Sequence, residues 1–351
     1  MPKDLKCQEK GFFLGFFCGF FSLIQGRPNK RQWSLVRTKT GRPCQEEGNS
    51  PVFRNLLDSR LEQVPVPGHN GSSRSKPVQE VILPHRSGPL ERLKPMSNDR
   101  RPLKPYPSVS RLSDPERVQL VKEIFATVTG KYDFLNHALS LRRDVAWRRS
   151  AVSRMRFFHT HRLLDAAAGT CDLSMEAARR YSGLQVTALD LVPEMIEAGR
   201  RKIRRRDLSS RIHLVRGDAL HLPFDDAHFD AVSMAFGIRN IPDRLGALRE
   251  MIRVLVPEGQ VLILEMTIPR APLFRPFYTF YLHTVLPRLA RAVSPNPEAY
   301  HYLADSIENF PSPQAFARLM RRAGLERVQT HSLTCGITCL HVGIKPEGDL
   351  R

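Results

Sequence analysis

From residue 114 onward, the chain alternates between short apolar runs and longer stretches in which apolar residues recur at helical spacing. Apolar runs of strand length occupy residues 162–167, 184–189, 212–215, 229–235 and 260–266. Helical spacing fits residues 118–125, 172–181, 193–206 and 243–255. Because strands that alternate with helices are typical of βαβ units, the pattern predicts an α/β fold with a parallel sheet.

A different pattern follows the fifth apolar run. Phe274, Phe277, Tyr278 and Tyr281 recur at i, i+3, i+4 and i+7, which predicts that they share one helix face. We expect a helical insertion at about residues 268–310 that caps the carboxyl edge of the sheet, where open α/β folds bind ligands. A helix at 313–323 and two strands within 325–344 are expected to follow, and residues 257–259 (Pro-Glu-Gly) are interpreted as a turn.

The first third of the chain has another composition. Residues 1–112 contain 20 Lys and Arg against 9 Asp and Glu, and 13 of the 27 prolines, without sustained apolar periodicity. Such a segment is predicted to be largely disordered, with a domain boundary near Pro115 and an ordered domain over 113–351. The formal charge of the whole chain, +19, favours a polyanionic partner, either nucleic acid or an anionic membrane surface.

Residues 11–24 form the longest apolar run, GFFLGFFCGFFSLI. Fourteen residues are too few to cross a bilayer comfortably, and no small-x-small cleavage pattern follows them. Two interpretations stay open: a Phe-rich interfacial anchor, or a start of translation assigned too far upstream. The six cysteines do not have the spacing of a disulfide framework or a zinc site, so reduced cytosolic thiols and no metal are expected.

Polar and small residues follow the first three predicted strands. The first strand leads through Asp165 into a small-residue loop and then a helix, an arrangement that lets backbone N–H groups approach a ligand. Asp190 ends the second strand and could accept both hydroxyls of a ribose, or alternatively cap the next helix. Gly217, Asp218 and Ala219 follow the third strand, where an acid or amide can meet an adenine amino group. Together the three indicate an adenosine ligand.

Several motifs, in order, resemble the UbiE/MenG family, the C-methyltransferases of ubiquinone and menaquinone biosynthesis. The resemblance covers about residues 118–346. Its most specific match is FGIRN at 236–240, and it includes VKEIF at 121–125, GKYDFLN at 130–136, LPR at 286–288 and YHYLADSI at 300–307. Trp147 stands where the family has a tryptophan.

This resemblance implies a class I S-adenosylmethionine-dependent methyltransferase fold: seven mostly parallel strands, the last one antiparallel, with helices on both faces and a helical cap insertion. By position, the implied cofactor-binding residues are Gly169, Thr170, Asp190, Asp218, Ala219 and Ala235. The implied catalytic residues are Arg239, Asn240 and Tyr132, with Arg239 expected to face the oxygen of the acceptor.

The resemblance also implies a substrate and a place in the cell. The methyl donor would be S-adenosyl-L-methionine, with no metal. The acceptor would be a polyprenylated quinol, either demethylmenaquinol or 2-polyprenyl-6-methoxy-1,4-benzoquinol. We expect a cytoplasmic protein, peripheral to the inner face of the membrane, with a homodimer as one oligomeric state and no nucleic-acid partner.

The chain departs from the family pattern in the loop after the first strand. Ala168 and Cys171 replace glycines of the family's AGGTGD loop, and a side chain there is costly where φ must be positive. His137, Arg142 and Asp144 also replace residues common in relatives. Two alternatives therefore stay open: a cofactor-binding scaffold that has lost catalysis, and, from the charge alone, a nucleic-acid methyltransferase.

Overall fold

A computed structural model describes residues 112–347, except 141, 273, 294–295 and 297. The predictions for the first 111 residues, including the apolar run at 11–24, lie outside the described residues. Within the described part, one seven-stranded sheet has the order β3-β2-β1-β4-β5-β7-β6. Its strands are β1 (Arg162–Ala166), β2 (Gln185–Asp190), β3 (Ile212–Arg216), β4 (Phe229–Ala235), β5 (Leu255–Met266), β6 (Glu326–Leu333) and β7 (Thr338–Ile344).

The strand directions confirm the predicted fold class. β1 pairs in parallel with both β2 and β4, β2 with β3, and β4 with β5. β7 is antiparallel to both of its neighbours, β5 and β6. Because the order reverses between β1 and β4, the carboxyl ends of these two strands border a crevice, which is the usual ligand site of an open α/β sheet.

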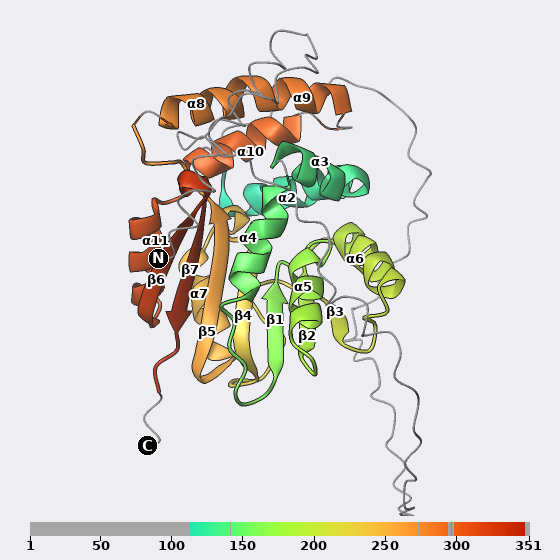
Figure 1. Cartoon of the computed structure of the whole chain (residues 1–351), viewed down its shortest axis with the longest axis vertical. Helices are drawn as coiled ribbons and strands as arrows, with labels where there is room; N and C mark the ends of the chain where they lie inside the picture. Colours follow the sequence, from blue (N-terminus) through green and yellow to red (C-terminus); the bar gives the residue numbers. More distant parts are fainter. Residues whose placement is uncertain (1–111, 141, 273, 294–295, 297, 348–351) are drawn as a thin grey trace, which may run out of the picture. The chain divides into compact units, whose positions relative to one another are not determined.

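Helices cover both faces of the sheet (Figure 1). One apolar core joins the sheet to α4 (Arg143–Val152), α5 (Asp172–Arg180) and α6 (Pro193–Arg205). The core on the other face joins it to α7 (Arg244–Arg253) and α11 (Pro313–Arg322). Each helix presents one apolar stripe, so burial of that stripe against the strands positions the loops at the strand ends.

A third apolar core forms the cap above the ends of the parallel strands (Figure 1). It joins α2 (Asp114–Val128) to α8 (Arg275–Phe280), the π-helical segment η5 (Tyr281–Val285), α9 (Leu286–Val293) and α10 (Glu298–Glu308). The short helices η3 (Thr129–Lys131) and α3 (Tyr132–Leu139) follow α2, and η4 (Ile238–Asn240) follows β4. The helical insertion between β5 and α11 thus lies where the sequence predicted it.

Three details differ from the predictions. Residues 257–259, which were predicted to form a turn before the fifth strand, lie within that strand, because β5 already begins at Leu255. Between the pairs Phe229–Leu255 and Ala231–Gln260, β4 advances by two residues whereas β5 advances by five. β5 therefore bulges there, with Glu258 at φ +63°. The aromatic residues of α8 do not all share one environment, since Phe274 and Tyr278 are buried whereas Phe277 is 51% exposed. Finally, α3 and α4 were not predicted.

None of the helices in the described part of the chain is both long and apolar enough to cross a membrane.

Candidate functional site

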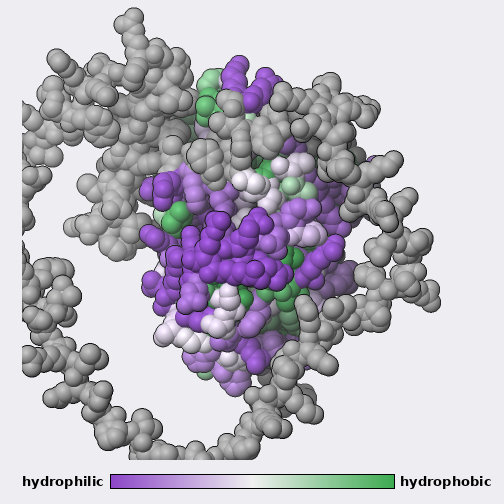
Figure 2. All heavy atoms as spheres, turned by 90° about the vertical axis from the view of Figure 1, so that its right-hand side faces the viewer, coloured by the Kyte–Doolittle hydropathy of each residue, from purple (hydrophilic) through white to green (hydrophobic). Residues whose placement is uncertain are grey.

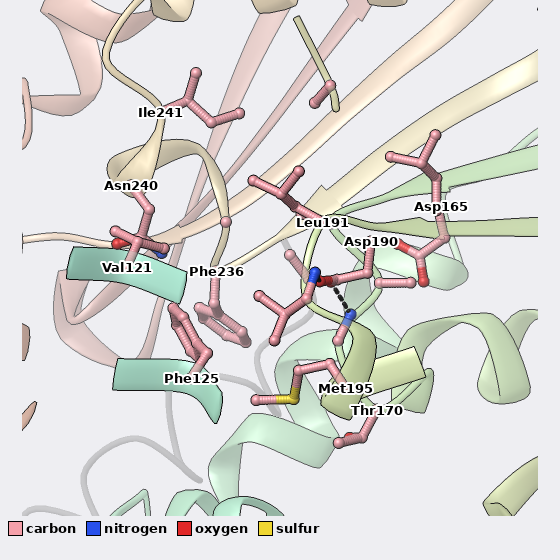
Figure 3. A pocket seen from close by; sticks show the side chains of 18 of the residues that line it. Val121, Phe125, Asp165, Thr170, Asp190, Leu191, Met195, Phe236, Asn240 and Ile241 are labelled. Carbon is pink, nitrogen blue, oxygen red and sulfur yellow. Dashed lines mark hydrogen bonds between the residues drawn. The ribbon is translucent and has the colours of Figure 1, made fainter. Parts of the chain in front are cut away.

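One pocket lies at the carboxyl ends of β1, β2, β3 and β4, beneath α2. It brings together eight of the nine residues that the sequence singled out: Tyr132, Gly169, Thr170, Asp190, Asp218, Ala219, Ala235 and Asn240. Figure 3 shows Asp165 and Asp190 close together, with Phe125 of α2 next to Phe236 elsewhere in the lining. The three polar positions after β1, β2 and β3 therefore meet at one site, because parallel strands end at the same edge.

Asp190 connects the ends of β1 and β2. Its Oδ2 accepts a hydrogen bond from the Gly169 N–H at 2.7 Å, and its Oδ1 accepts one from the Val192 N–H at 2.9 Å. Val192, and not Asp190, is the N-cap of α6, so a plain capping role is not what the structure shows. Burial raises the pKa of Asp190, although the backbone hydrogen bonds act in the opposite direction. A carboxylate has about four lone-pair sites, which leaves acceptor capacity for ligand hydroxyls.

The loop between β1 and α5 forms the floor of the pocket. Ala167, Gly169 and Cys171 have φ values of +62°, +56° and +65°, whereas Ala168 is outside the left-handed region. A Cβ built on Gly169 would meet no atom within 4 Å, so the space in front of this backbone is open. Of the two family glycines that are replaced here, only the one at Cys171 therefore demands a conformation that disfavours a side chain.

A charged network that the sequence did not predict closes the end of the pocket near Thr170. The Thr170 hydroxyl donates to Asp133 Oδ1 at 2.6 Å. Lys202 Nζ donates to Asp133 Oδ2 at 2.7 Å, to Thr170 Oγ1 at 3.0 Å and to Asp172 Oδ1 at 2.5 Å. Lys202 belongs to the basic run 200–206 at the end of α6, in which Arg200, Arg201, Arg204 and Arg205 are exposed. Lys202 follows the buried Gly199 by three residues, which places it on the inward side of α6.

Arg148 and Asp144 form a second network beside the pocket. Arg148 donates to Asp144 Oδ2 at 2.6 Å, and its guanidinium lies 5.5 Å from the ring centre of Phe236. His137 and Ser140 also contact the Asp144 carboxylate, at 2.7 and 2.8 Å. Burial acts to raise the pKa of Asp144, but these hydrogen bonds and the charge of Arg148 outweigh it and lower the pKa. Two of the departures from the family pattern, His137 and Asp144, thus lie in one satisfied cluster.

Asp165 is a buried acid of the pocket lining. It is 1% exposed, and burial raises its pKa to about 6. Ser174 donates to its Oδ2 at 2.5 Å and Ser233 to its Oδ1 at 3.3 Å, and both hydrogen bonds oppose the effect of burial. The carboxyl group therefore titrates near neutral pH.

The structure corrects the expected position of Arg239. Its side chain does not line the pocket: its Nη1 donates to Glu265 Oε1 and to the Phe236 carbonyl oxygen, each at 2.6 Å. Arg239 is 5% exposed and Glu265 is fully buried. The charge of Glu265 keeps the pKa of Arg239 raised although burial alone would lower it. A buried carboxylate attracts the cation more strongly than the solvated pocket does, and the sequence pattern could not show this partner.

Asn240 and Tyr132 do reach the pocket. Asn240 Oδ1 accepts a hydrogen bond from the Tyr302 hydroxyl at 3.1 Å. The ring of Tyr132 packs edge-on against Phe125, with the centroids 5.8 Å apart. Burial raises the pKa of Tyr132, and the nearby charge of Arg239 acts to lower it. Apolar residues of α2, among them Val118 and Val121, complete this wall.

Within the described residues, no group of three or more His, Cys, Asp or Glu side chains is arranged to hold a metal ion.

Comparisons with known proteins identify the family of the chain. The model of the ubiE/COQ5 methyltransferase family matches residues 113–345. The chain is 41% identical over 231 residues to the ubiquinone/menaquinone biosynthesis C-methyltransferase UbiE of Geotalea daltonii, covering 66% of this chain and 98% of that protein. It is 41% identical to the demethylmenaquinone methyltransferase of Deinococcus radiodurans (66% and 94%) and 43% identical to that of Mycobacterium marinum (65% and 94%). The chain belongs to the ubiE/COQ5 methyltransferase family.

Proposed function

We propose that this protein transfers a methyl group from S-adenosylmethionine to a ring carbon of a polyprenylated quinol. The observation that carries the proposal is the pocket itself, in which the polar ends of β1, β2 and β3 and an apolar wall from α2 line one cavity. The relatives are named as methyltransferases of ubiquinone and menaquinone biosynthesis, which supports this choice of acceptor.

The polar part of the pocket suits S-adenosylmethionine. Four carboxylates line it, those of Asp165, Asp172, Asp190 and Asp218. Arg148 is the one cation among the lining residues, and Lys202 pairs with Asp172 from outside the lining. Such an excess of negative charge favours a ligand that carries a sulfonium and an ammonium group. When bound, this cofactor supplies an activated methyl group on a positively charged sulfur. Asp190 would hold the ribose, Asp218 and Ala219 the adenine, and Gly169 and Thr170 the methionine end.

The opposite part of the pocket suits an aromatic acceptor with an apolar tail. Val118, Val121 and Phe125 offer an apolar surface, and Tyr132 and Asn240 place a hydroxyl and an amide on the same side. These two polar groups can orient the hydroxyls of a quinol by hydrogen bonds, so that the ring carbon faces the methyl group as it becomes nucleophilic. Asn240 is itself held by Tyr302, so its amide is positioned before the acceptor binds.

Arg239 acts through this arrangement as a positioning residue. Its cation is fixed by Glu265 and lies close enough to Tyr132 to counteract the effect of burial on the tyrosine pKa. A preorganised positive charge behind the acceptor site favours the oxygen charge that develops when the quinol loses its proton. The FGIRN motif thus supplies three residues that line the pocket, Phe236, Gly237 and Asn240, and one, Arg239, that holds the turn through its hydrogen bond to the Phe236 carbonyl oxygen.

The place of the reaction in the cell follows from the acceptor. A polyprenylated quinol resides in a bilayer, so we propose that the enzyme is peripheral to the cytoplasmic face of the membrane. A homodimer and the lack of a nucleic-acid partner stay predictions from the sequence.

Methyl transfer from labelled S-adenosylmethionine tests the proposal. We expect label in the ring of reduced demethylmenaquinol or of reduced 2-polyprenyl-6-methoxy-1,4-benzoquinol, and comparison of the two identifies the acceptor. Tyr132→Phe and Asn240→Ala should lower turnover while S-adenosylmethionine still binds. Tight cofactor binding with no transfer to either quinol would contradict the proposal and favour a scaffold without catalysis.

A further inference from the structure

The helical stretch from Arg275 to Val293 has an unusual composition. In the 32 residues from 266 to 297 there is no Asp or Glu, whereas Arg270, Arg275, Arg288 and Arg291 are all present. Within the described residues, four large hydrophobic side chains are exposed, and three of them belong to this stretch: Phe277 (51%), Phe280 (48%) and Leu289 (37%). The exposed apolar residues of the domain are therefore concentrated on α8 and α9.

These side chains are on the outer side of the cap. Tyr278, Leu282, Leu286 and Ala290, spaced by four residues, are buried in the core shared with α2 and α10. With the inner side so defined, Phe277, Phe280 and Leu289 point away from the domain, and Arg275, Arg288 and Arg291 are exposed beside them. Glu308 of α10 is paired with His283 of this stretch at 2.8 Å. The outer side of α8 and α9 is thus both apolar and cationic.

We propose that this outer side of α8–α9 is the surface by which the enzyme lies on a bilayer with anionic headgroups. An interfacial helix inserts aromatic and aliphatic side chains to the depth of the acyl boundary and keeps its arginines among the headgroups. Anionic lipid headgroups are identified as the binding partner by charge complementarity, since a stretch with arginines and no acid attracts a negatively charged surface. The proposal rests on the proposed function, because a long-tailed quinol is what would require the enzyme at a membrane.

The position of the cap fits this role. α2 contributes Leu120 and Ile124 to the core that it shares with α8–α10, and Val121 and Phe125 to the pocket wall. One helical layer therefore separates the outer surface from the acceptor side of the pocket. A quinol whose tail stays in the bilayer would have a short path to its ring site.

Another basic surface has a different character. Figure 2 faces the side that bears α6 and shows hydrophilic residues gathered over that helix. Arg200, Arg201, Arg204 and Arg205 are exposed there, and two of them pair with Glu197. No large hydrophobic side chain of the described residues is exposed on α6. Without residues to insert, α6 is the appropriate comparison for charge alone.

A position-specific probe tests the surface in the full chain. Phe280→Trp is mixed with phosphatidylcholine–phosphatidylglycerol vesicles that contain brominated acyl chains, and the emission of the native Trp33 and Trp147 is subtracted with the unsubstituted protein. We expect a blue shift and strong quenching at position 280. Phe158→Trp is the matched control, because Phe158 is also 51% exposed but precedes β1 at the other end of the sheet. Its emission should not change.

Vesicle sedimentation gives the strength of binding. Phe277→Ser with Phe280→Ser should lower partitioning roughly 10- to 100-fold, and Phe158→Ser should not. Arg288→Ala and Arg291→Ala should each cost roughly fivefold on anionic vesicles and nothing on pure phosphatidylcholine, whereas Arg204→Ala should have a smaller effect.

Three results would overturn the proposal. Position 280 could stay unquenched although the protein sediments with vesicles, which would assign binding to another surface. Both tryptophans could be quenched alike, which would indicate insertion without orientation. The serine pair could change the sedimentation coefficient in lipid-free solution, which would make the surface an interface between copies. Methylation of a short-tailed, soluble demethylquinol without vesicles depends on the pocket alone, so it separates failure of this proposal from failure of the proposed function.

Discussion

Cys171 and Gly199 form a pair whose energetics can be worked out from the structure. Cys171 occupies a left-handed conformation at the N-cap of α5, with its side chain fully buried. A Cβ built on Gly199 of α6 would lie 2.7 Å from the Cys171 sulfur, and its next neighbour would be the Gly169 carbonyl oxygen at 3.5 Å. The missing side chain at 199 therefore provides the space for the thiol at 171.

Gly199→Ala is consequently expected to have opposite effects in two backgrounds. In the natural chain the new methyl group collides with the sulfur, and such overpacking costs about 1–3 kcal/mol. It offsets the gain of about 1 kcal/mol that alanine brings to a helix interior. In a Cys171→Gly background the collision is absent, so only the gain remains. The coupling energy between the two substitutions should therefore be about 2 kcal/mol.

The assay is equilibrium unfolding in urea of the four proteins of this cycle, monitored by circular dichroism. Gly130→Ala is the control, since a Cβ there would meet no atom within 4 Å and the residue does not have a positive φ. It should change stability equally in both backgrounds. A coupling energy between Cys171 and Gly199 no larger than that of the control would refute the reasoning, because it would mean that the sulfur does not occupy the space beside α6.

Four further outcomes are expected. Asp190→Ala should weaken S-adenosylmethionine binding in calorimetric titration by loss of charge-assisted hydrogen bonds to ribose, about 1.5–3 kcal/mol each, and an unchanged affinity would reject this assignment. Burial raises the pKa of Asp165 from 3.8 to about 6, so its ionised form costs about 3 kcal/mol at pH 7. The free energy of unfolding should therefore rise as the pH falls from 7 to 5. Asp165→Asn should reduce this rise in urea titrations at each pH, and Asp190, whose pKa burial also raises, should account for a remainder. Arg239→Ala should lower both turnover and the melting temperature, because it leaves Glu265 buried without its partner at a cost of about 3–5 kcal/mol. Arg239→Ala combined with Glu265→Gln should recover the melting temperature but not the turnover. Deletion of residues 1–111 should leave a cooperative thermal transition, because α2 begins after this segment with its own capping box at Ser113, and a chain that no longer melts cooperatively would contradict this.

The sequence by itself determined the order of elements and the positions of the site. Strand-length apolar runs alternate with helical spacing from residue 162 to 266, and the structure has β1 to β5 in those places. This succeeded because burial against two helical layers requires continuous apolar runs in the strands. Asp190 and Asp218 were found because they lie at the ends of β2 and β3, and parallel strands end together at one edge, whereas Asn240 came from the resemblance carried by FGIRN.

Only the tertiary structure decided which charges face which. Lys202 turns inward from a basic run because Asp133 and Asp172 are close to it, and those acids come from segments 69 and 30 residues away. Arg239 turns away from the pocket because Glu265, on the neighbouring strand β5, is buried and needs a cation. Side-chain electrostatics depends on distances in space and on exclusion of water, and neither is written in the local periodicity of a chain.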